Sequence, residues 1–204
     1  MTDRDPKTDL RTYLRDARDA LLWKLDGLSE YDVRRPMTPT GTNLLGLVKH
    51  VAGAEALYFG AAYGRPFEGP PLWITGDAEP NADLWARSDE TREDIVGLYR
   101  RACAHADETI AALPLDAVGR IPGGGELTLH HSLTHMIAET QRHAGHADIV
   151  RELIDGAVGQ RPRGLNTPDR DASWWDAHRE RVERAARDAG QGLSGGSRLP
   201  GQDT

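Results

Sequence analysis

Apolar residues recur at spacings of three and four positions in four stretches of the chain, a pattern typical of amphipathic helices. The first helix is predicted over residues 8–28, where leucines recur at this spacing and arginine and aspartate lie between them. The second follows the breaker-rich segment RRPMTPTGTN, where Thr42 or Asn43 would cap it, and it is predicted to end near Gly64. Both helices therefore have one face suited to a buried core.

The other two stretches lie in the second half of the chain. Ser88 begins a capping pattern for a third helix, whose apolar positions extend to Leu113. The fourth helix is the longest: it begins in the segment LTLHH and stops at Gly156, since glycine commonly follows the last residue of a helix. Beyond it, residues 171–189 predict a short terminal helix.

Strand signals are nearly absent, because β-branched and aromatic residues do not gather in alternating runs. The sequence therefore predicts an all-α fold, a four-helix bundle with a long loop after the second helix and a short C-terminal helix. We expect one domain over residues 1–189 and a disordered tail over 190–204, which is rich in glycine and polar residues. The long loop, RPFEGPPLWITGDAEPNADLW, contains Trp73 and Trp85, and loops of this length are often functional.

Composition narrows the classes of function. The net charge is -7 and basic residues are interspersed with acidic ones, which argues against a nucleic-acid partner. No apolar run approaches the roughly 20 residues of a membrane-spanning helix, and the charged N-terminus lacks the apolar stretch of a secretory signal. The single cysteine, Cys103, cannot form an internal disulfide, which fits a reducing compartment. We therefore predict a cytoplasmic protein that binds neither nucleic acid nor membrane.

Candidate chemistry is concentrated in the fourth helix. His135, Glu139 and His143 follow one another at steps of four residues, and His146 lies about one turn further along. A histidine and a carboxylate at this spacing can direct both donor atoms at one metal ion. A third ligand must come from another helix, and His50 is the natural candidate because it lies within the apolar segment LLGLVKHVAG.

Each of these residues also has an ordinary structural explanation. A lone histidine within a helix is more often a core group with satisfied hydrogen bonds, which applies to His50. The pair Glu139 and His143 fits equally well an exposed helical pair that contributes a few tenths of a kcal/mol. Spacing alone leaves both explanations open.

The segments LLGLVKH and HMIAETQRHAGHADIVRELIDG resemble the DinB-like superfamily, and the resemblance covers roughly residues 8–156. It implies a bundle in which one histidine of the second helix and two residues four apart on the fourth helix bind a metal ion. That pair is usually two histidines, whereas here Glu139 takes the first position, which is similar to the mycothiol-dependent maleylpyruvate isomerase branch with its zinc held by two histidines and a glutamate. The motif from Glu139 to Asp148 resembles still more closely actinobacterial members described as mycothiol transferases. The arginine-rich, lysine-poor composition agrees with the high-GC bacteria that make mycothiol.

The resemblance implies a divalent metal, expected to be zinc, held by His50, Glu139 and His143, with His135 and His146 as additional candidate ligands. Two imidazoles and one carboxylate leave an open coordination position, as in catalytic zinc sites. A thiol bound there would lose its proton, because a cation favours the thiolate. The chain would then be a metal-dependent thiol S-transferase, in which mycothiol or a similar low-molecular-weight thiol attacks an electrophilic small molecule.

Two further residues are candidates for substrate contact: Arg142 for an anionic group of the thiol, and Trp73 for an apolar wall of the pocket. Three alternatives stay open. The same metal site would serve a thiol-dependent isomerase, the chain would bind a metal or metabolite as a non-catalytic stress protein, or the bundle would be an interaction module without metal. The sequence also leaves open the electrophile, the native metal and whether the protein forms a homodimer.

Overall fold

The computed structural model describes residues 5–68, 78–162 and 168–194. These belong to two compact units, residues 1–164 and residues 165–204, each of which is described by itself. The predicted division into a domain over 1–189 and a tail over 190–204 stays a prediction.

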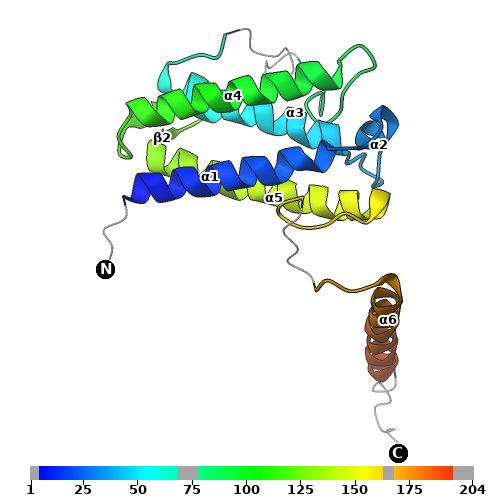
Figure 1. Cartoon of the computed structure of the whole chain (residues 1–204). Coiled ribbons are helices and arrows are strands. Elements are labelled where there is room, and N and C mark those ends of the chain that lie inside the picture. Colours follow the sequence, from blue (N-terminus) through cyan, green and yellow to red (C-terminus); the bar gives the residue numbers. More distant parts are fainter. Residues whose placement is uncertain (1–4, 69–77, 163–167, 195–204) are drawn as a thin grey trace, which may run out of the picture. The chain divides into compact units, whose positions relative to one another are not determined.

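Four helices of the first unit form a bundle, which confirms the predicted all-α class. They are α1 (Pro6–Leu22), α3 (Leu44–Glu55), α4 (Arg92–Ala112) and α5 (Leu129–Asp155). Figure 1 shows α3 and α4 in one layer and α1 and α5 in the other, and α3 also packs against α5. Apolar side chains from all four helices are almost completely buried between the layers, among them Leu14, Leu45, Ile110 and Leu133. Their removal from water is the main favourable contribution to the fold.

All four of these helices begin at a side-chain cap, and two of the caps test the predictions. Asn43 caps α3 by accepting a hydrogen bond from the backbone N–H of Gly46, so of the two predicted caps Asn43 is the one used. The prediction that Ser88 opens the third helix is wrong, because α4 is capped by Thr91. The Thr91 hydroxyl accepts from the backbone N–H of Asp94 and donates to its carboxylate, whereas the position three residues after Ser88 has no acidic side chain to reciprocate.

Helical backbone continues beyond α1 and α3 as short 3₁₀ and π-helical turns. A 3₁₀ turn, η1 (Trp23–Leu25), follows α1. A π-helical turn, η2 (Ala56–Gly60), and a 3₁₀ turn, η3 (Ala61–Tyr63), follow α3, so the second helical stretch ends at Gly64 as predicted. The last bundle helix also ends where predicted: Gly156 has a φ of 79°, a left-handed conformation that glycine adopts without steric cost.

Three short elements were not predicted. The helix α2 (Glu30–Arg34) begins at the cap Ser29. The strands β1 (Val118–Arg120) and β2 (Glu126–Thr128) form an antiparallel hairpin between α4 and α5. Elements of three to five residues are too short to display a helical or strand period, so sequence patterns do not reveal them.

A buried ion pair connects three of the bundle helices. Arg18 of α1 donates two hydrogen bonds of 2.7 Å to the carboxylate of Glu55, whose side chain is fully buried at the end of α3. A third hydrogen bond, of 2.8 Å, joins the same guanidinium to Asp107 of α4. Because each buried charge is paired and hydrogen-bonded, removing one partner would leave the other uncompensated in the core.

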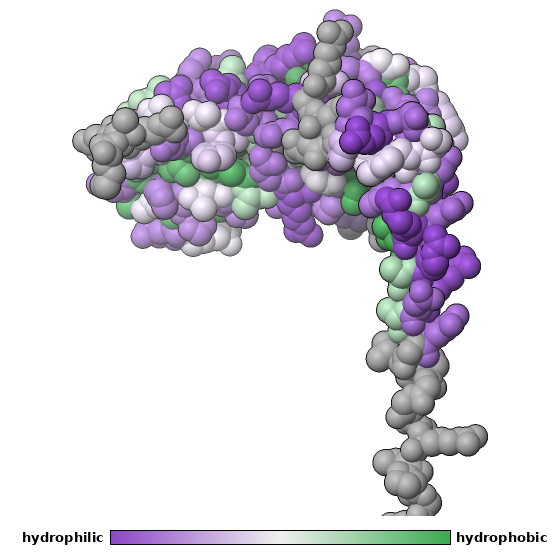
Figure 2. Space-filling view, turned by 60° about the horizontal axis from the view of Figure 1, so that its bottom comes forward, coloured by the Kyte–Doolittle hydropathy of each residue, from purple (hydrophilic) through white to green (hydrophobic). Residues whose placement is uncertain are grey.

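The helix α6 (Ala172–Ser194) belongs to the second unit. It covers the predicted terminal helix and continues a few residues past position 189. Figure 2 shows polar residues along one side of α6 and apolar residues along the other. None of the helices in the described ranges is long and apolar enough to cross a membrane.

Candidate metal centre

Three potential metal ligands meet where α3 packs against α5: His50 from α3, and Glu139 and His143 from α5. Their donor atoms all lie within 4.8 Å of one another. One oxygen, Oε1 of Glu139, is 3.3 Å from Nε2 of His50 and 2.9 Å from Nε2 of His143. The two imidazole rings have centroids 4.7 Å apart and are nearly perpendicular. A single carboxylate oxygen therefore faces two imidazole nitrogens.

The helices themselves explain this arrangement. Glu139 and His143 are one turn apart on α5, so their side chains project from the same face. His50 lies five residues before Glu55, the last residue of α3, and its ring reaches Glu139 of α5. The exposed fraction of the side chain is 26% for His50, 23% for Glu139 and 11% for His143, so the three groups are shielded from water but still reachable.

The surroundings set the protonation states of two of these groups. Burial lowers the pKa of His143 below its usual 6.5, and the neighbouring His50 acts in the same direction, against the hydrogen bond with Glu139. For Glu139, burial alone would raise the pKa, but the contacts of its carboxylate with the imidazoles of His50 and His143 outweigh it and the pKa is lowered. Near neutral pH the site thus contains a carboxylate and a neutral His143, which are the forms that bind a cation.

The donor set fits a divalent ion. Two imidazole nitrogens and one carboxylate oxygen are the protein ligands of many catalytic zinc sites. Ligand atoms each about 2.1 Å from a tetrahedral ion are about 3.4 Å apart. The His50–Glu139 distance of 3.3 Å is close to that value, whereas the His143–Glu139 distance of 2.9 Å is shorter, that of a direct hydrogen bond. Within the described ranges, these are the three His, Cys, Asp or Glu residues whose donor atoms come together in this way.

A cleft of about 380 Å³ opens beside the three residues. Two of them, His50 and Glu139, line it, together with Asp83 and His135. The remaining lining is apolar or aromatic: Gly53, Ala54, Leu57 and Tyr58. The His135 ring stacks on Tyr58 with centroids 4.3 Å apart. In this structure His135 is therefore part of the cleft wall and is not one of the three potential metal ligands.

The other residues predicted for the site lie outside the donor group. His146 is exposed, and its ring centroid is 5.5 Å from that of His143. Arg142 is exposed on α5 and is not among the residues that line the cleft. Trp73, predicted to form an apolar wall, lies outside the described residues. Their roles in binding stay predictions.

One residue of the site was not predicted: Asp83, in the loop between η3 and α4. Its Oδ2 accepts a hydrogen bond of 2.6 Å from Nδ1 of His50. The loop itself was predicted to be functional because of its length, but its tryptophans were chosen as the relevant residues. Nothing in the sequence distinguishes one aspartate of a loop from another, so the path of the backbone was needed to find it.

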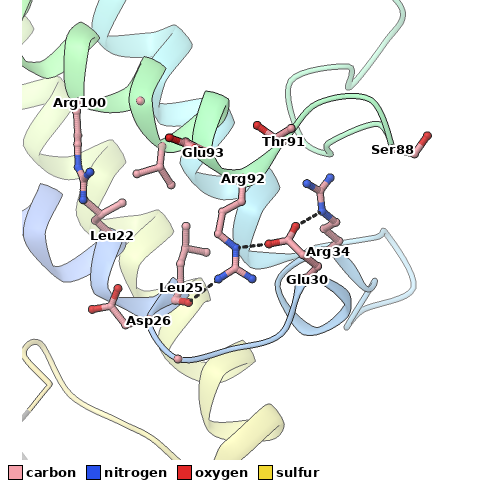
Figure 3. Close-up of a pocket in the computed structure, with 13 residues that line it drawn as sticks. Leu22, Leu25, Asp26, Glu30, Arg34, Ser88, Thr91, Arg92, Glu93 and Arg100 are labelled. Atoms are coloured by element: carbon pink, nitrogen blue, oxygen red, sulfur yellow. Dashed lines mark hydrogen bonds and ion pairs between the residues drawn. The ribbon is translucent and has the colours of Figure 1, made fainter.

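A larger cleft, of about 850 Å³, lies between η1, α2 and the start of α4 (Figure 3). Two arginines that line it are already engaged: Arg34 and Arg92 both form ion pairs with Glu30, at 3.0 and 2.7 Å. Arg92 also donates to the backbone carbonyls of Leu25 and Leu28. These contacts join α2 and η1 to α4, and none of the three donor residues lines this cleft. We therefore place the candidate chemistry at the smaller cleft.

One known protein family matches most of the chain. The model of the family described as Mycothiol-S-transferase matches residues 9–156. The matched range includes all of α3, α4 and α5 and the three donor residues. No curated protein matches the sequence.

Proposed function

Because the chain belongs to the mycothiol-S-transferase family, we propose that it is a metal-dependent thiol S-transferase. Its thiol substrate would be mycothiol or a similar low-molecular-weight thiol, and its second substrate a small electrophile. The observation that supports this best is the convergence of His50, Glu139 and His143 beside an open cleft. The product would be a thioether, formed as the sulfur bonds to the electrophilic carbon and a leaving group departs.

In this proposal His50, Glu139 and His143 hold a divalent ion, for which we favour zinc because it accepts mixed nitrogen and oxygen ligands. When bound, such an ion lowers the pKa of a coordinating thiol and so supplies a thiolate near neutral pH. The lowered pKa values of Glu139 and His143 reduce competition from protons for their donor atoms. These two side chains would thus be ready to bind the ion at physiological pH.

The cleft would bind the electrophile. Its volume of about 380 Å³ lies at the small end of the range for ligand pockets, which favours small substrates. The stacked rings of Tyr58 and His135 offer a flat wall, and the apolar residues beside them reduce the water around the reacting groups. Arg142, exposed on α5, is our candidate for contact with an anionic group of the thiol.

The protein's own thiol is unsuited to the role of nucleophile. Burial raises the pKa of Cys103 well above its usual range, and the nearby Glu55 carboxylate adds to this effect. Cys103 is on α4 and is absent from the lining of the cleft. In the proposed reaction the thiol therefore comes from a co-substrate.

The test is a conjugation assay on zinc-loaded protein with mycothiol and chlorodinitrobenzene, an electrophile that loses chloride when a thiolate adds. We expect a rate above the uncatalysed reaction, a product with the mass of the thioether, and loss of the excess rate in His143→Ala. Equal rates with and without protein would contradict the proposal. With an unsaturated substrate in the same assay, a product of unchanged mass would instead indicate isomerisation.

A further inference from the structure

The segment formed by residues 83–85 lies along α3 next to the candidate metal centre. Two side chains hold its backbone: the amide of Asn43, the cap of α3, donates to the carbonyl of Leu84 at 3.0 Å, and the ammonium of Lys49, within α3, donates to the carbonyl of Trp85 at 2.9 Å. Asn43 and Lys49 are themselves buried. The 83–85 segment is thus held against α3 at two successive backbone carbonyls, those of Leu84 and Trp85.

Close approach of the two backbones depends on Gly46. A Cβ atom at this position would lie 1.9 Å from the carbonyl oxygen of Leu84, which is far inside van der Waals contact. The segment can therefore lie against α3 only where the helix has no side chain. This packing determines the position of the preceding residue, Asp83.

Asp83 is placed to fix the His50 ring. Because its carboxylate accepts from Nδ1 at 2.6 Å, the proton of a neutral His50 resides on Nδ1 and the lone pair on Nε2. That lone pair faces Oε1 of Glu139 at 3.3 Å, an arrangement that is favourable when a cation lies between the two atoms. His143 has no equivalent support, since its Nδ1 is buried without a hydrogen-bond partner in the described part of the chain.

We propose that Asp83 is a positioning residue of the metal centre: held by the contacts of the 83–85 segment with α3, its carboxylate keeps His50 in the tautomer and ring orientation that present Nε2 to the ion. This inference rests on the metal site of the proposed function. Carboxylates that accept the second N–H of a metal-binding histidine typically improve metal affinity about 10- to 100-fold. No sequence motif marks Asp83, because its contact with His50 arises from the path of the loop.

The first test measures the zinc dissociation constant of the full chain by competition with a chelator. We expect Asp83→Ala to weaken zinc binding about 10- to 100-fold. Asp83→Asn should weaken it less, because the amide keeps one acceptor oxygen but loses the charge. Asp89→Ala is the matched control: it removes an exposed carboxylate of the same loop, one that forms an ion pair with Arg87 and lies outside the cleft lining, and zinc binding should not change.

The second test does not depend on metal. In the metal-free wild type, nitrogen chemical shifts of the His50 ring should show the proton on Nδ1, and in Asp83→Ala the neutral ring should move toward the tautomer protonated on Nε2. An unchanged tautomer and an unchanged dissociation constant in Asp83→Ala, with zinc bound normally by the wild type, would overturn the role of Asp83 alone. Failure of the wild type to bind zinc would overturn the metal site of the proposed function and, with it, this inference.

Discussion

Two histidines on the same face of α5 have different surroundings and therefore different properties. His143 is buried beside Glu139, and burial keeps its imidazole neutral by lowering the pKa. His135 is half-buried, stacks on Tyr58 and lines the cleft. The same residue type thus provides a donor atom at one position and an aromatic wall at the other.

This difference predicts that His135→Ala leaves zinc binding unchanged and weakens binding of the electrophile. Removing the His135 ring from the cleft wall takes away an aromatic contact with the electrophile worth about 0.5–1.5 kcal/mol, which raises KM roughly two- to tenfold. Metal content and steady-state kinetics measure the two effects separately. His130→Ala, at an exposed position on the same helix, should change neither quantity. Loss of zinc in His135→Ala would show that His135 is a ligand and would contradict this division of roles.

The donor residues could be predicted from sequence to the extent that their geometry is local. Glu139 and His143 are related by one turn of a single helix, and His50 lies in a strongly apolar stretch, so both signals are contained in short segments. Asp83 could not be predicted, because its contact with His50 depends on how a long loop returns to α3. Arg142 was chosen because it lies beside the metal-binding face of the helix; in the structure it is exposed and outside the cleft lining, and its role in binding stays a prediction.

At the scale of elements, one arginine connects the end of α5 to η1 and the turn after it. The Arg151 guanidinium donates to the carbonyls of Lys24 and Asp26, at 2.9 and 2.8 Å. It also forms two hydrogen bonds, of 2.9 and 2.7 Å, with the carboxylate of Asp155. The hydrogen bonds from Arg151 lower the pKa of Asp155 below its usual 3.8, although burial acts in the opposite direction.

Asp155→Asn should therefore reduce the free energy of unfolding at pH 7 by about 1 kcal/mol, a modest value because the carboxylate is one-third exposed. Since the pKa is lower in the folded than in the unfolded protein, the contribution of the carboxylate is present above about pH 3.8 and is lost as the pH falls. Urea unfolding at a series of pH values measures this. A difference between variant and wild type that stays constant into acid would contradict the account.

The exposed pair of Arg120 and Glu126 in the hairpin supplies the control for that experiment. Both side chains are about two-thirds exposed, so solvent screens their 2.7 Å contact. Glu126→Gln should change the free energy of unfolding by less than about 0.5 kcal/mol at any pH.

Element prediction succeeded where the hydrophobic period extended over several turns and failed for short elements. The four bundle helices display their period over many residues, whereas α2 and the β1–β2 hairpin do not. The sequence pattern also did not predict the π-helical backbone of η2, because the spacing of apolar residues continues through this segment without a visible change. The capping residue of α4 depended on which of two neighbouring polar side chains had an acidic partner three residues later.

At the scale of the whole molecule, the core belongs to the first unit. All side chains that are buried in the described ranges lie between Leu14 and Arg151. The family match, residues 9–156, spans the same region. The bundle thus contains the buried apolar surface that a domain of this size needs to be stable.

We therefore predict that a chain ending at residue 164 folds cooperatively and binds zinc as tightly as the full chain. Circular dichroism during thermal unfolding would show one sharp transition, with a helical signal smaller than that of the full chain because α6 is missing. Chelator competition would give the zinc dissociation constant. A broad transition or loss of zinc binding in the shortened chain would contradict the prediction.

The most direct test of the central claim is the metal content of the protein, purified without an affinity tag and measured by plasma mass spectrometry. Wild type is compared with His143→Ala and with His146→Ala, which removes the exposed histidine one turn further along α5. The account predicts about one equivalent of metal in the wild type and in His146→Ala, and its loss in His143→Ala. No metal in the wild type after incubation with zinc, or equal metal in all three proteins, would contradict it.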